Sequence, residues 1–168
     1  MSALFTSQLV SIKTNGYLDY LSGLPEATRE EAKLRFASMT VSMWFYMEAV
    51  DGYRKKVERD KIISWIQLFF SEDSLFPNNI YDENKRKKIL KNLMDNETIS
   101  IKIDSIIEYI NTLPDTIRNA FFNDACLIVN LDKQIATKEL QFLEEFAKKI
   151  TIKSEDKKKM FSRHWILD

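Results

Sequence analysis

Two segments of the sequence, residues 36–50 and 120–131, are largely apolar on every side when they are drawn as helices. Helices of this kind lie in the middle of a domain, because they have no polar face to turn towards water. The chain contains only three glycines and three prolines, too few for the many turns of an all-β fold. We therefore predict an all-α protein with two buried helices at its centre.

Shorter helical patterns occupy most of the remaining chain. Apolar residues recur at helical intervals after the first buried segment, as expected for amphipathic helices around a core. Asp82, Thr137 and Ser154 stand where N-caps are needed. We predict a bundle of about seven helices forming a single domain over residues 1–168, with one or two short helices broken at Asn15-Gly16 and longer ones at residues 25–50, 57–70, 83–94, 100–112, 114–131, 137–150 and 154–165.

The charge balance argues against general nucleic-acid binding. The chain has 25 basic and 25 acidic residues and a formal net charge of zero, whereas phosphate binding favours a basic excess. The first residues lack the basic and apolar regions of a secretory signal. Residues 36–50 are shorter than the ~20 residues of a membrane-spanning helix. We expect a cytoplasmic protein with no transmembrane segment.

No catalytic constellation is apparent from the residues. Cys126 lies in an apolar run and is expected to be a buried thiol. His164 is the only histidine, and we expect it at the surface, away from any nucleophile. Glu144 and Glu145 are adjacent, so on a helix they point in different directions. An enzyme is therefore not expected. The aromatic residues of the two apolar segments are expected in the core, with a ligand pocket as the alternative.

An internal repeat places acidic residues at matching positions. Asp132 follows Asp51 by 81 positions, and Glu139 follows Glu58 by the same number. In each copy an apolar helix is followed by an acid in a turn and a second acid near the start of the next helix. The same offset pairs apolar residues on both sides of the turn, namely Tyr46 with Leu127, Met47 with Ile128, Val50 with Leu131, Ile62 with Leu143 and Ile66 with Ala147.

The two copies, AVDGYRKKVERDKI and NLDKQIATKELQFL, resemble the TerB-like superfamily of helical proteins, which is named for bacterial tellurite resistance. The family signature is an apolar helix that ends in Ala-Asp-Gly, followed by a small apolar residue and a Glu that opens the next helix. Asp51 and Gly52 match it in the first copy, and Asp132, Ile135 and Glu139 match it in the second. The resemblance covers about residues 36–152.

The resemblance implies a divalent-cation site at the acidic turns. Asp51, Glu58, Asp132 and Glu139 would then form a carboxylate cluster of the kind that suits hard cations. The alternative is that each Asp bonds the local backbone of its turn and each Glu stabilises a helix N-terminus. No cofactor beyond such a cation is expected.

The resemblance also implies a function. We expect a non-enzymatic stress-response or tellurite-resistance-type module that acts through protein partners and binds a divalent cation. The alternative is a helical adaptor for protein–protein interaction without any ion site. A homodimer is left open.

Overall fold

The computed structural model describes residues 6–50, 56–96, 102–131, 137–164 and 166. These residues form eight helices and no strand, so the all-α prediction is confirmed. The helices are α1 (Tyr17–Ser22), α2 (Glu26–Glu48), α3 (Lys56–Leu68), α4 (Glu83–Asp95), α5 (Ile103–Ile110), α6 (Asp115–Val129), α7 (Thr137–Lys149) and α8 (Ser154–Arg163).

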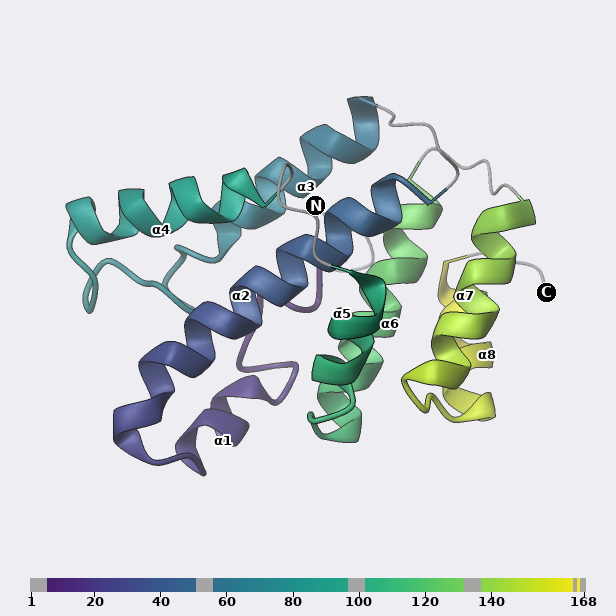
Figure 1. Ribbon diagram of the computed structural model, residues 1–168, viewed down its shortest axis with the longest axis horizontal. Coiled ribbons are helices and arrows are strands. Elements are labelled where there is room, and N and C mark those ends of the chain that lie inside the picture. The colour runs from purple at the N-terminus through teal and green to yellow at the C-terminus, as the bar shows by residue number, and fades with distance from the viewer. Residues whose placement is uncertain (1–5, 51–55, 97–101, 132–136, 165, 167–168) are drawn as a thin grey trace.

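Helix α2 forms the spine of the molecule. It packs against α1, α3, α4, α5 and α6, and Figure 1 shows it crossing the molecule with α3 and α4 along one side and α5 and α6 along the other. Helices α7 and α8 both pack against α6. The two central helices therefore join two sets of peripheral helices.

The core lies where α2 meets α6, as the two apolar segments predict. Phe36 and Trp44 of α2 and Phe121 and Phe122 of α6 are completely buried. Phe36 stacks on Tyr17 with ring centroids 3.9 Å apart and meets Phe121 edge-on at 5.8 Å. Aromatic pairs of this geometry add stability beyond the area that they bury. Cys126 is also buried in this core, as predicted.

Several helix boundaries follow from local chemistry. The Asp82 carboxylate accepts a hydrogen bond of 2.8 Å from the backbone N–H of Lys85, so the predicted N-cap of α4 is confirmed. Ser154 was expected as the N-cap of α8, which is wrong by one residue. Lys153 occupies that position with extended backbone angles and no side-chain cap, and Ser154 is the first helical residue. Thr137 is likewise the first residue of α7.

The turn at Asn15-Gly16 also forms as predicted. Gly16 has a φ of 86°, in the left-handed region where a residue without Cβ is favoured. The Asn15 side chain accepts from the backbone N–H of Tyr17 and donates to the carbonyls of Gln8 and Leu9. These bonds position the N-terminal segment against the core before α1 begins.

Helix α2 is long, with 23 residues. Its first half carries charges on several sides, among them Glu26, Arg29 and Glu30, and only its second half is largely buried. Within the described ranges, every helix is too short or too polar to cross a bilayer.

A pair of substitutions tests the core. Phe36→Ala removes a ring that contacts both Tyr17 and Phe121, so we expect it to lower the free energy of unfolding by about 3–5 kcal/mol. Leu34→Ala, two residues earlier in the same helix, is the control. Leu34 is 40% exposed, so we expect a change within about 0.5 kcal/mol. Denaturant unfolding of the two variants measures both, and equal losses would contradict the assigned core.

Candidate functional site: the groove between α2 and α7

The structure describes the four predicted cation ligands only in part. Asp51 and Asp132 lie outside the described residues, and so does the side chain of Glu58, which belongs to α3. Glu139 lies in the first turn of α7 and is 2% exposed. The ion site therefore stays a prediction. Among the described residues, no three His, Cys, Asp or Glu side chains are grouped so that they could hold a metal ion.

The described residues next to the acidic turns do meet at one end of the bundle. Val50 follows the end of α2 and Lys138 lies at the start of α7, and both line the same groove. A second glutamate, Glu48, is the last residue of α2 and is 1% exposed. Two buried glutamates, Glu48 and Glu139, therefore come from the two helix ends that meet at this groove.

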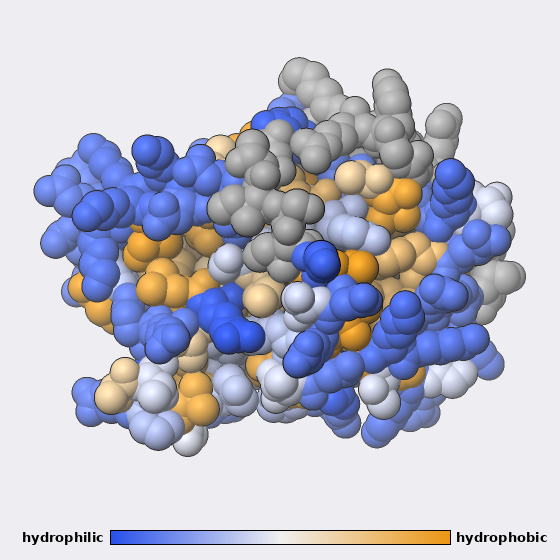
Figure 2. All heavy atoms as spheres, in the orientation of Figure 1, coloured by the Kyte–Doolittle hydropathy of each residue, from blue (hydrophilic) through white to orange (hydrophobic). Residues whose placement is uncertain are grey.

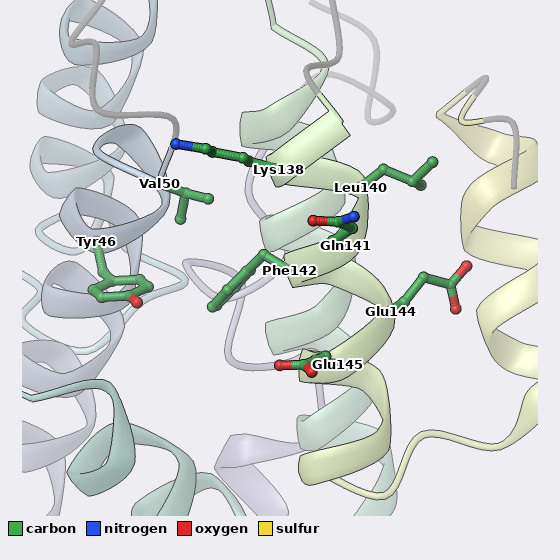
Figure 3. Close-up of a pocket in the computed structure, with 8 residues that line it drawn as sticks. All are labelled: Tyr46, Val50, Lys138, Leu140, Gln141, Phe142, Glu144 and Glu145. Atoms are coloured by element: carbon green, nitrogen blue, oxygen red, sulfur yellow. The ribbon is translucent and has the colours of Figure 1, made fainter.

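The described residues form a groove between α2 and α7. Its volume is about 740 Å³, within the range of binding sites for ligands and side chains. Figure 3 shows its walls. The lining residues are Tyr46, Val50, Lys138, Leu140, Gln141, Phe142, Glu144 and Glu145. Figure 3 shows that Leu140 and Glu144 point away from α2.

Aromatic rings form the floor of the groove. Tyr46 of α2 and Phe142 of α7 approach to 5.5 Å between ring centroids, and Phe142 stacks on Phe146 at 5.4 Å. Tyr46, Val50 and Phe142 are only half-buried, so part of each remains available to a ligand. Figure 2 shows hydrophobic surface between α2 and α7, bordered by the hydrophilic side chains of α7.

Charged side chains border the groove on α7. Lys138 lies at the N-terminal end of this helix and Glu145 lies two turns later, and Figure 3 shows both on the side that faces α2. Glu144 points to the opposite side, where it forms an ion pair of 2.6 Å with Lys157 of α8. The adjacent glutamates therefore diverge, as predicted.

The amphipathic pattern of α7 explains the groove. Leu143, Phe146 and Ala147 are buried, and Phe146 lies 6.4 Å from the ring of Phe122 on α6. The adjacent face of α7, which includes Phe142, faces α2 but is only partly buried. The C-terminal end of α7 is held to the end of α5, because the Asn111 side chain donates to the carbonyl of Lys149 at 2.9 Å.

A second polar cluster lies inside the core, on α6. Asp124 is completely buried. It accepts hydrogen bonds from the Ser7 hydroxyl at 2.5 Å, the Gln8 backbone N–H at 2.8 Å and the Trp44 indole N–H at 3.0 Å. Burial raises the pKa of Asp124 to about 6, although these hydrogen bonds act in the opposite direction.

The expected surface position of His164 is wrong. The residue is 4% exposed, because Asn123 of α6 provides an acceptor for its ring at 2.9 Å from Nε2. Arg163 donates to the same Asn123 oxygen at 3.0 Å, and Asn130 donates to the backbone carbonyl of His164. Burial, followed by the nearby charge of Arg163, lowers the pKa of His164 to about 4.

This cluster anchors the chain ends. Asp124 binds the N-terminal segment through Ser7 and Gln8, and Asn123 binds the C-terminal segment through Arg163 and His164. Among the described residues the imidazole bonds to Asn123 and the Ser7 hydroxyl donates to Asp124. The Ser7 hydroxyl hydrogen is therefore used in a hydrogen bond to the Asp124 carboxylate, and this bond has a structural role. The polar pair Asn123-Asp124 within an apolar helix was the sequence signal for it.

A scan against protein-family models and searches of the curated proteins and the solved structures found no match to this chain. The TerB-like resemblance therefore rests on the residues of the two acidic turns, and the internal repeat stays a prediction.

Asp124 and His164 have opposite effects on the pH dependence of stability. Asp124 has a pKa of about 6 in the fold and 3.8 in the unfolded chain, so its contribution grows as the pH falls through that window and is lost as the pH rises through 6. His164 has a pKa of about 4 in the fold and 6.5 in the unfolded chain, so its contribution is present above 6.5 and is lost as the pH falls towards 4.

Single substitutions separate these two effects. In Asp124→Asn only the histidine effect remains, so the free energy of unfolding should fall more steeply between pH 6.5 and 4 than in the wild type, by up to about 1.4 kcal/mol per pH unit. In His164→Gln only the aspartate effect remains, so the free energy of unfolding should rise, relative to the wild type, as the pH falls from 6.5 to 4. Urea unfolding at several pH values measures the three slopes. If the free energy of unfolding varied with pH in the same way in all three proteins, the assigned pKa shifts of Asp124 and His164 would be wrong.

Proposed function

We propose that the protein is a non-enzymatic helical module that binds protein segments in the groove between α2 and α7. The observation that carries this proposal is the half-buried aromatic floor formed by Tyr46 and Phe142, with charged residues on its rim. Grooves with an apolar floor and a polar rim are typical of sites that accept an amphipathic helix from another protein chain.

The chemistry of the groove supports binding of a side chain. Tyr46, Val50 and Phe142 offer apolar contact, and Lys138 and Glu145 offer opposite charges about two helical turns apart. Asp124 and His164, whose pKa values are shifted by burial, form hydrogen bonds within the core and do not line the groove. The groove is therefore suited to recognition.

A second candidate function is the divalent-cation module that the TerB-like resemblance implies. One observation favours it, namely that Glu48 and Glu139 are almost completely buried at the helix ends that adjoin Asp51 and Asp132 in the sequence. Carboxylate oxygens are the ligands that hard divalent cations prefer. A cation held there would make the protein an ion-dependent stress-response module that still uses its groove for partners.

Selection of peptides tests the groove. A library of 20-residue amphipathic helices would be selected on the full chain, and binders would then be compared on Phe142→Glu and on Lys159→Glu. Because Phe142 lines the groove and Lys159 is an exposed residue of α8, we expect selected peptides to lose at least about tenfold in affinity on the first variant only. Circular dichroism confirms that both variants fold. Equal binding to both variants, or no binders, would contradict the proposal.

Calorimetry tests the cation. Metal-free chain would be titrated with calcium and with zinc ions, and its melting temperature would be measured with each. The ion hypothesis predicts saturable heat and a higher melting temperature, because a ligand that binds only the folded chain stabilises it. Asp132→Asn should weaken both effects, whereas Asp156→Asn in α8 should not. No heat and no melting shift with either ion would remove the ion site and leave the groove proposal intact.

A further inference from the structure

We infer that the occupant of the groove is a second copy of this chain, bound with its α7 antiparallel to the first. This inference rests on the proposed function, because it names the partner of the same groove. It is carried by the order of charged and apolar residues on the side of α7 that faces the groove.

That side of α7 is complementary to itself under two-fold symmetry. Lys138 and Glu145 are seven residues apart, about 10 Å along the helix, and Gln141 and Phe142 lie midway between them. If a second α7 runs antiparallel with the axis at residues 141–142, each Lys138 faces the Glu145 of the other copy. A two-fold contact uses the same patch twice, so one substitution changes both ion pairs.

The charges of Lys138 and Glu145 are available to a partner. Acidic groups stabilise a helix N-terminus and basic groups its C-terminus. Glu139, Lys148 and Lys149 follow that rule, whereas Lys138 in the first turn departs from it. Glu145 precedes the last turn, where the rule no longer applies. Within the described part of the chain, neither Lys138 nor Glu145 forms an ion pair. An antiparallel partner would supply the opposite charge to each.

The centre of this patch is apolar, as the core of a dimer contact requires. Phe142 lies midway between the two charges and is half-buried. Tyr46 and Val50 extend the apolar surface onto α2. The second α7 would therefore lie over the aromatic floor between α2 and the first α7. An unrelated helix could satisfy the apolar contacts, whereas a second copy presents the apolar centre together with the opposite charge for each end of the patch.

Charge exchange tests this contact in solution. Sedimentation equilibrium of the full chain should show a monomer–dimer equilibrium. K138E and E145K should each weaken dimerisation by about tenfold or more, because each turns two attractive pairs into repulsive ones. An equimolar mixture of the two variants should dimerise again, and so should the double variant K138E/E145K. Lys138 and Glu145 are exposed, and circular dichroism confirms that each variant folds.

A cross-link provides an independent measurement. Gln141 is exposed and lies close to the inferred axis, so Q141C should form a disulfide-linked dimer on mild oxidation, whereas K159C on α8 should not.

The inference is overturned if the wild type is monomeric up to its solubility limit, if the dimer is indifferent to both charge reversals, or if neither the mixture nor the double variant recovers. If the chain is monomeric but selected helices bind in a Phe142-dependent way, the second copy fails as the partner and the proposed function stands.

Discussion

Trp44 and Asp124 connect the two central helices, since the indole N–H of α2 donates to the carboxylate of α6 at 3.0 Å inside the core. The same carboxylate holds Ser7 and Gln8 of the N-terminal segment. A buried carboxylate is costly unless hydrogen bonds surround it, so Asp124 favours the packing in which all three donors reach it. This preference favours one register of α2 on α6 and holds the N-terminal segment against both helices.

The groove follows from that register. Helix α2 is packed by α1, α3, α4 and α5, whereas α7 and α8 pack on α6. Helix α7 therefore approaches α2 over the edge of α6, where the rings of Tyr46 and Phe142 meet. The hydrogen bond from Asn111 to Lys149 ties the C-terminal end of α7 to the end of α5, and the groove occupies the space beside the N-terminal turns of α7.

The sequence was sufficient to predict the helices and the core, because both depend on the periodic spacing of apolar residues. Phe36, Trp44, Phe121 and Cys126 are buried as that spacing requires. The position of His164 could not be predicted in this way. Its burial depends on a hydrogen bond to Asn123, 41 residues earlier in the chain, and no local pattern reports such a pairing. The groove depends likewise on which faces of α2 and α7 remain uncovered once α6 has packed against both.

The two candidate functions use the same end of the molecule. The groove begins near Val50, which follows α2, and Lys138, in the first turn of α7. The predicted cation ligands Asp51 and Glu139 are direct sequence neighbours of these two residues. A cation shared by the acidic turns would fix the end of α2 relative to the start of α7, and would also reduce the negative charge that a partner meets beside Lys138. Ion binding and occupation of the groove would then be linked, since each ligand would favour the arrangement that the other requires.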